Sequence, residues 1–294
     1  MQVPLLALTG GDPLLRADLF PIIQYASNHS VQTVLTLLPT PNVNAEVFSD
    51  LKACGLMRVG FWLHGSTPGL NDRHWGTNGL HRRTLEMIGA CHEVQLPVHV
   101  NTIVARRNVL DIEPMVELLT RLDVEWWNVF FSVPASREQA AEMLTAAEHE
   151  EIFAKLYQAA QRVQFHIKTT EAPHYQRYIL QRRMRESRGR LNASDVVGDS
   201  PKSVNEGQGF VFINHQGEVY PSRFLPVSAG NITAQSLSEM YSDSELFLSL
   251  RDFSRLKGKC GRCPMRTLCG GSRARAYAVT GDIFAPEPCC AYEP

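Results

Sequence analysis

Short runs of apolar and β-branched residues alternate with helix-length amphipathic segments through about the first 170 residues of the chain. This alternation is typical of β/α units around a parallel sheet. It predicts six strands, at residues 3–9, 31–37, 57–63, 98–104, 124–131 and 163–169. It also predicts helices between the strands, including residues 80–94 and 110–122. Six strands with helical crossovers favour an α/β fold with an open, partial (β/α) barrel, whose ligand site lies at the carboxyl ends of the strands.

The pattern changes near residue 181. The segment QRRMRESRGR contains five arginines, which we interpret as a solvated helix end that complements the helix dipole rather than as an anion site. The polar stretch LNASDVVGDSPKSVNEGQG is typical of a linker, and GFVFINHQGEVYP then predicts a β-hairpin. We therefore expect a partial β/α barrel at residues 1–190, a linker at 191–207 and a small cysteine-rich domain at 208–294.

Composition and charge exclude several classes of protein. The 294 residues are 44% hydrophobic and 20% charged, which excludes a disordered or low-complexity chain. A net charge of -1 gives no electrostatic reason to expect nucleic acid or an anionic membrane as a partner. The N-terminus lacks the features of a signal peptide, and no stretch approaches the roughly 18 apolar residues of a membrane span. We expect a cytoplasmic protein.

Five of the seven cysteines lie in the last 35 residues, a clustering that indicates metal binding in a reducing compartment. Cys260, Cys263, Cys269 and Cys290 form the spacing Cys-x2-Cys-x5-Cys-x20-Cys. Four thiolates fit a tetrahedral zinc ion or an iron–sulfur cluster equally well. We favour Cys290 over its neighbour Cys289 as the fourth ligand, because adjacent side chains point apart.

Four arginines lie in the same segment: Arg262, Arg266, Arg273 and Arg275. Their charge either stabilises a net-negative thiolate cluster or belongs to the surface of a helix over residues 273–279. The sequence leaves both interpretations open.

The tail resembles a known domain. The segments LKGKCGRCPMRTLCGGSRARAYAVTGD and CCAYEP are similar to the C-terminal SPASM domain of radical S-adenosylmethionine (radical SAM) proteins. The segment GFVFINHQGEVYPSRFLPVSAGNI resembles the hairpin that opens this domain. The resemblance implies an auxiliary 4Fe-4S cluster held by the four cysteines. Ser222 stands where many relatives have a cysteine, which implies one auxiliary cluster rather than two.

The first half of the chain resembles the same family. LTGGDPLLR is similar to the Gly-Gly-Glu-Pro element that meets the methionyl group of S-adenosylmethionine, which implies this role for Gly10, Gly11, Asp12 and Pro13. VHVNTIVARRN resembles a fifth-strand segment, and the resemblance adds three cofactor-binding residues: Asn101, Thr102 and Arg106. KTTEAPHYQRY resembles the sixth-strand exit of haem-modifying and peptide-modifying members.

The sequence also departs from the family's pattern. Radical SAM proteins bind their first 4Fe-4S cluster with a Cys-x3-Cys-x2-Cys loop, and none of the seven cysteines has this spacing. We therefore expect a barrel that lacks its first β/α unit, with the chain starting at the second strand. WLHG and NDRHWG replace the family's Ser-Leu-Asp-Gly and His-Asp-x-x-Arg-Gly elements, so Trp62 and Trp75 either fill the nucleoside site or pack a core edge. The family implies S-adenosylmethionine as a cofactor, whereas the missing cysteines argue against its cleavage by this chain.

Three functional hypotheses follow. The first is a radical SAM/SPASM enzyme that, in its full-length form, takes electrons from a donor, generates a 5'-deoxyadenosyl radical and modifies a peptide or tetrapyrrole-type substrate. The second is a non-catalytic binding protein that keeps the cluster and the substrate groove. The third is a structural module stabilised by zinc. No catalytic residue is assigned, because substrate contacts vary freely on one fold.

Overall fold

The computed structural model describes residues 3–40, 43–187 and 205–294. The chain divides into two compact units. The first comprises Met1–Phe130 and Gln158–Lys168, and the second comprises Phe131–Tyr157 and Thr169–Pro294. The chain therefore enters the second unit twice, once between the fifth and sixth strands and again after the sixth.

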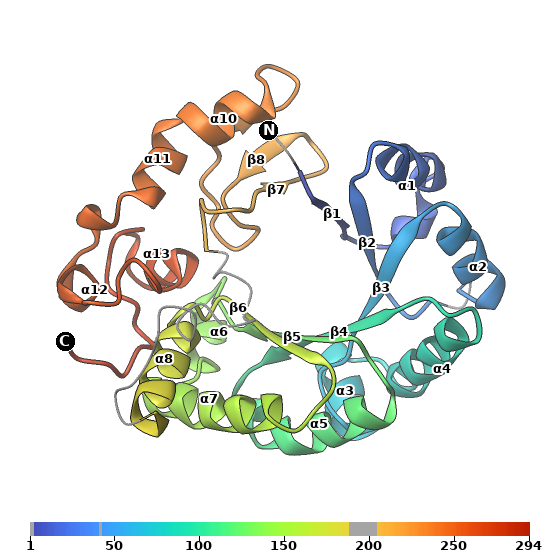
Figure 1. Cartoon of the computed structure of the whole chain (residues 1–294), viewed down its shortest axis with the longest axis horizontal. Helices are drawn as coiled ribbons and strands as arrows, with labels where there is room; N and C mark the ends of the chain where they lie inside the picture. The colour runs from blue at the N-terminus through green and yellow to red at the C-terminus, as the bar shows by residue number, and fades with distance from the viewer. Residues whose placement is uncertain (1–2, 41–42, 188–204) are drawn as a thin grey trace. The chain divides into compact units, whose positions relative to one another are not determined.

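A six-stranded sheet dominates the first part of the chain, and its strands lie in the order of the sequence, β1 to β6 (Figure 1). The pairs β1·β2, β2·β3 and β3·β4 are parallel. The strands are β1 (Leu5–Leu8), β2 (Gln32–Leu37), β3 (Leu56–Trp62), β4 (Val98–Val104), β5 (Trp126–Phe131) and β6 (His166–Thr170). Helical crossovers between consecutive parallel strands produce the curled half-barrel that the sequence predicts.

Helices cover one face of this sheet (Figure 1). They are α1 (Leu19–Asn28), α2 (Ala45–Ala53), α3 (Pro68–Trp75), α4 (Leu80–Glu93) and α5 (Ile112–Arg121), with short 3-10 helices at Pro13–Leu15 and Arg106–Asp111. Side chains on this helix-covered face form the core; Leu35, Phe61 and Val100, for example, are fully buried. Neighbouring positions along each strand point to the other face, which we call the uncovered face. That face has a more polar character, with His99 and Asn101 on β4.

The second unit contains α6 (Arg137–Ala141), most of α7 (Ala146–Ala160) and α8 (His174–Glu186). A small antiparallel sheet follows, with β7 (Phe212–Ile213), β8 (Glu218–Tyr220) and β9 (Gly230–Asn231) in that order. The remaining helices are α10 (Leu237–Asp243), α11 (Glu245–Arg251), a 3-10 turn at Phe253–Arg255, α12 (Gly258–Arg262) and α13 (Arg273–Thr280). Val219, Met240 and Phe247 pack as one apolar cluster behind the small sheet.

The predicted partial barrel and its six strands are confirmed, with differences at the ends of strands and helices. The fourth strand has the predicted bounds, whereas the sixth starts at His166 because residues 161–165 close the preceding helix in a turn. The helix predicted over residues 110–122 is preceded by a 3-10 turn and starts at Ile112. None of the described helices combines the length and apolar character of a membrane span.

The division into two units does not follow the predicted domain limits. Residues 131–157 and 169–187, which the sequence places in the barrel domain, belong to the same compact unit as the cysteine-rich tail. Most of the predicted linker, 191–204, lies outside the described residues. The limits 1–190, 191–207 and 208–294 remain a prediction.

Candidate functional site

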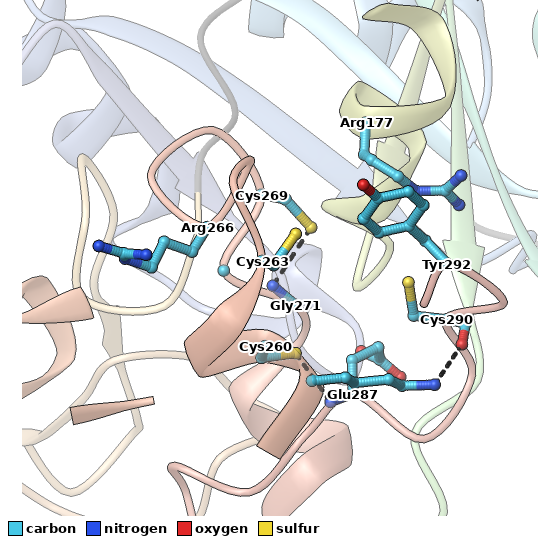
Figure 2. Close-up of a pocket in the computed structure, with 11 residues that line it drawn as sticks. Arg177, Cys260, Cys263, Arg266, Cys269, Gly271, Glu287, Cys290 and Tyr292 are labelled. Carbon is cyan, nitrogen blue, oxygen red and sulfur yellow. Dashed lines mark hydrogen bonds between the residues drawn. The ribbon is translucent and has the colours of Figure 1, made fainter. Parts of the chain in front are cut away.

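Four cysteine side chains line one pocket in the second unit (Figure 2). Cys260 lies on α12 and Cys263 caps its C-terminus, Cys269 follows in a loop, and Cys290 comes from the last residues of the chain. The structure thus brings together all four cysteines of the predicted ligand set, across 31 positions of sequence.

Glycines in the left-handed backbone region shape the loop that carries Cys269. Gly270 and Gly271 have φ values of 66° and 68°, which other residues rarely adopt. A side chain at Gly271 would also lie 2.7 Å from Cβ of Glu287. The close approach of these two segments holds the Cys269 loop against the C-terminal tail.

Two of the sulfurs accept hydrogen bonds from backbone amides. The N–H of Gly271 donates to Sγ of Cys269 at 3.4 Å, and the N–H of Glu287 donates to Sγ of Cys260 at 3.3 Å. Burial raises the pKa of the Cys269 and Cys290 thiols, because a thiolate there has lost its water. A bound metal supplies the positive charge that makes deprotonation favourable, so the site is suited to thiolates that bind metal.

Cys289 lies apart from this pocket. It is 3% exposed, and its Sγ lies 3.4 Å from the carbonyl oxygen of Leu144, to which the thiol donates. The chain turns at residues 288–289, and Cys290 faces the pocket while Cys289 packs into the core. No three His, Cys, Asp or Glu side chains within the described ranges are placed as ligands of a single metal ion.

Positive charge reaches the pocket from Arg177, a residue that no sequence pattern assigned to it. Arg177 of α8 lines the pocket, forms an ion pair with Glu150, and its guanidinium lies 5.8 Å from the ring centre of Tyr292 (Figure 2). Lys259 donates to the backbone oxygen of Cys290 at 2.6 Å. Because Arg177 precedes Cys260 by 83 positions, no local pattern indicates that they share a site.

The predicted arginines have different places. Arg266 lines the pocket and is exposed, and Arg262 is exposed as well. Arg273 and Arg275 are buried in α13 rather than on its surface. Arg273 donates to the backbone oxygens of Ile283 and Ala285 and so holds the chain ahead of Cys290.

The other predicted site residues belong to the first unit. At Gly10, Gly11, Asp12 and Pro13 the chain turns from β1 into a 3-10 helix, where Oδ1 of Asp12 accepts from the N–H of Leu14 at 3.1 Å. This is the geometry of a helix cap. The carboxylate therefore already has one backbone donor in this structure.

The residues predicted on β4 point to opposite faces of the sheet. Asn101 lies on the uncovered face, where its Oδ1 accepts from Nδ2 of Asn128 at 2.8 Å. The hydroxyl of Thr102 donates to the backbone oxygen of Leu63 and accepts from Nε1 of Trp127 within the core. Arg106 is exposed at the start of the following 3-10 helix. Asn101 is thus the member of this set that faces the interior of the half-barrel.

Aromatic rings gather near the carboxyl ends of β3 and β5. The ring centre of Trp62 lies 5.1 Å from that of Phe130 and 5.5 Å from that of His64. His64 stacks on His74 at 3.7 Å and lies 5.3 Å from Trp75. Burial, followed by the charge of the neighbouring groups, lowers the pKa of His64 to about 2, so this ring is neutral at physiological pH. Trp62 and Trp75 therefore both belong to this group of rings, with the guanidinium of Arg107 beside it, 2.6 Å from Nδ1 of His74.

Comparisons with known proteins place this arrangement in a family. Residues 205–264 match the model of the SPASM domain, described as an iron–sulfur cluster-binding domain. The chain is 35% identical over 291 residues to an AdoMet-dependent heme synthase of Methanosarcina barkeri, covering 99% of this chain and 83% of the relative. This chain belongs to the radical SAM/SPASM family.

Two further matches extend the comparison. A PqqA peptide cyclase of Bradyrhizobium diazoefficiens is 28% identical and covers 97% of this chain, which spans 73% of the relative. The crystal structure of Streptococcus suis SuiB bound to S-adenosylmethionine has the same fold, with a TM-score of 0.72 at 14% identity, over 98% of this chain and 66% of SuiB. The SPASM match includes Cys260 and Cys263 and ends before Cys269 and Cys290.

Proposed function

We propose that this radical SAM/SPASM chain holds one auxiliary 4Fe-4S cluster with Cys260, Cys263, Cys269 and Cys290 and that its substrate is a tetrapyrrole. The observation that carries the proposal is the 35% identity to an AdoMet-dependent heme synthase over 99% of the chain. The pocket lined by four cysteines supports the cluster, because each iron of a 4Fe-4S cluster takes one thiolate ligand.

The chain's own residues fit such a cluster. When bound, a 4Fe-4S cluster supplies one-electron transfer. The N–H groups of Gly271 and Glu287 donate to sulfur, and hydrogen bonds of this kind stabilise the reduced form. Arg177 and Arg266 place positive charge beside a net-negative thiolate set. We propose that electrons reach this site from a separate donor protein.

S-adenosylmethionine is a cofactor that the family implies. In this chain we propose Gly10, Gly11, Asp12 and Pro13 for its methionyl group, with Asn101 and Arg106 near it, whereas the Thr102 side chain points into the core on the other face of the sheet. Asn101 has the best-supported position, because it faces the interior of the half-barrel. Four cysteine ligands leave the auxiliary cluster without an open iron, so we assign no cleavage of the cofactor to that cluster.

The aromatic group at the strand ends supports a planar substrate. Trp62 and Phe130 are half-buried rings whose centres lie 5.1 Å apart, and flat conjugated molecules bind by stacking on such rings, whereas His64 is buried. A peptide substrate is the second candidate, and the 28% identity to a PqqA peptide cyclase favours it.

Titration with haem tests the proposed substrate class. The 294-residue chain, loaded anaerobically with iron and sulfide, is titrated with haem while the absorbance of the macrocycle is followed, and separately with an unrelated 20-residue peptide. We expect haem to bind at one equivalent. Its dissociation constant should lie in the micromolar range, which corresponds to a binding free energy of about -8 kcal/mol. Binding of the peptide without binding of haem would overturn the tetrapyrrole assignment in favour of the second candidate.

A further inference from the structure

Three basic side chains belong to the uncovered face of the large sheet, all within the first unit: Arg58 of β3, His99 of β4 and, one strand beyond β5, Lys168 of β6. Arg58 and His99 act electrostatically on each other, and both Lys168 and Arg58 lower the pKa of His99. The cysteine pocket lies in the other unit and includes none of these residues. Arg58 and Lys168 both carry positive charge, and like charges near each other repel, so the arrangement needs an explanation.

His99 is held in place by the absence of a side chain on the next strand. Its paired residue on β3 is Gly60, and a Cβ there would lie 2.0 Å from Nε2 of the imidazole. The Nε2 corner of the ring therefore occupies the space beside Gly60 that a side chain would fill. His99 is 4% exposed, and its Nδ1 has no hydrogen-bond partner among the described residues. Leaving a buried polar atom unpaired costs about 1–3 kcal/mol.

Arg58 has one acceptor and one unpaired donor. Its Nη1 donates to Oε2 of Glu125 at 2.8 Å, and the guanidinium lies 5.1 Å from the ring centre of Trp126. Its Nε is buried and has no partner among the described residues. The Glu125 side chain is half exposed, so this carboxylate lies at the edge of the group rather than between its members.

Lys168 is the third donor. Within the described part of the chain its ammonium makes no hydrogen bond and no ion pair. Burial lowers the pKa of Lys168, and the nearby Arg58 charge lowers it further. Burial also lowers the pKa of His99 to about 3, followed by the effects of Arg58 and Lys168. The ring of His166, on the same strand, stacks on Trp126 at 4.5 Å and adds no negative charge.

We propose that Arg58, His99 and Lys168 form a binding site for a carboxylate group of the substrate. A carboxylate has two oxygens that accept several hydrogen bonds, and it would pair the three donors that now lack an acceptor. Arg58 and Lys168 carry two positive charges against the single charge of Glu125, which leaves a surplus that one anion neutralises. A neutral His99 donates from Nδ1 in the tautomer that carries its proton there.

The distance along the strands suits a tetrapyrrole, and in this respect the inference rests on the proposed function. Trp62 lies four positions after Arg58 on β3, so the two residues are about 13 Å apart along the strand. The carboxylate site therefore lies at one end of the uncovered face and the aromatic group at the other. Haem has a planar ring with carboxylate side arms, so its ring would stack near Trp62 while one arm reaches Arg58.

The test compares haem with its dimethyl ester, in which both carboxylates are blocked. We expect the ester to bind wild-type chain about tenfold more weakly than haem, because a hydrogen bond to a charged group contributes about 1.5–3 kcal/mol. Lys168→Met should weaken the binding of haem by a similar factor and leave the binding of the ester unchanged. Lys168→Arg should restore haem binding. Arg121→Met removes an exposed charge from α5 and serves as the matched control, with no expected change.

The outcomes separate this inference from the proposed function. If neither haem nor ester binds wild-type chain, the tetrapyrrole assignment fails and the carboxylate site fails with it. If haem binds but Lys168→Met binds it as tightly as wild type, the carboxylate site alone is wrong. If millimolar inorganic phosphate displaces haem and acetate does not, the site takes phosphate and the assignment to a carboxylate is wrong.

Discussion

The guanidinium of Arg275 and the carboxylate of Glu287 form an ion pair at 3.1 Å, with exposed fractions of 0% and 1%. Arg275 also donates to the backbone oxygen of Glu171 at 2.6 Å, and Glu287 accepts from the N–H groups of Ser272 and Cys289. The pair thus joins α13 to the tail that carries Cys290. Glu287 itself lines the cysteine pocket, where its charge adds to the burial that raises the pKa of Cys269 and Cys290.

Removing one partner of this pair should strongly destabilise the second unit. Arg275→Met leaves Glu287 buried and uncompensated, and we expect a loss of about 3–5 kcal/mol in the free energy of unfolding. Urea denaturation followed by circular dichroism measures this loss. The exposed pair between Lys257 and Asp282 is the control, because Asp282→Asn should cost under about 1 kcal/mol. Equal effects of the two changes would contradict the role of the buried pair.

The carboxylate of Glu171 should lower the stability of the folded chain as pH rises. Burial, and then the neighbouring Glu206, raises the pKa of Glu171 well above its usual value, although Ser272 donates to Glu171 at 2.6 Å. The folded pKa lies above the unfolded one, so the unfolded state loses its proton first as pH rises. Stability should therefore fall by up to about 1.4 kcal/mol for each pH unit between the two pKa values.

Glu171→Gln tests this prediction, because the amide keeps the shape and removes the charge. We expect the variant to be more stable than wild type at pH 8 and to lose the decline between pH 5 and 8. Thermal unfolding across that range gives the comparison. The contrary result is a wild-type unfolding temperature that rises steadily from pH 5 to 8, with the same rise in Glu171→Gln. It would show that Glu171 does not cause the pH dependence.

Patterns within short segments predicted the six strands and the hairpin, because alternation and turn chemistry are local properties, and the four predicted cysteines line one pocket. The burial of Arg275 was not predictable, since the segment SRARAY has the composition of a solvent-exposed helix. Its partner Glu287 lies 12 positions away and contacts it only through the fold. Arg177 and Lys168 acquire their surroundings in the same way, from strands and helices far apart in sequence.

The 294-residue chain should not cleave S-adenosylmethionine. None of its seven cysteines has the Cys-x3-Cys-x2-Cys spacing, and contacts through Gly10 to Pro13 and Asn101 must offset the ordering cost of a flexible ligand without a metal bond. The measurement is formation of 5'-deoxyadenosine under dithionite, against a control without protein. Joining a segment with that cysteine spacing from a heme synthase relative should produce activity. Product from the unextended chain would show that another group starts the reaction.

The metal content of the cysteine pocket decides whether its four cysteines hold a 4Fe-4S cluster. Iron, acid-labile sulfide and zinc are measured after anaerobic reconstitution of wild type, Cys290→Ser and the matched control Cys289→Ser. We predict about four irons and four sulfides per chain, with broad visible absorbance, for wild type and Cys289→Ser. Cys290→Ser should lose most of both, because its sulfur faces the pocket whereas that of Cys289 bonds to Leu144. One equivalent of zinc without iron, or full iron in Cys290→Ser, would contradict the account.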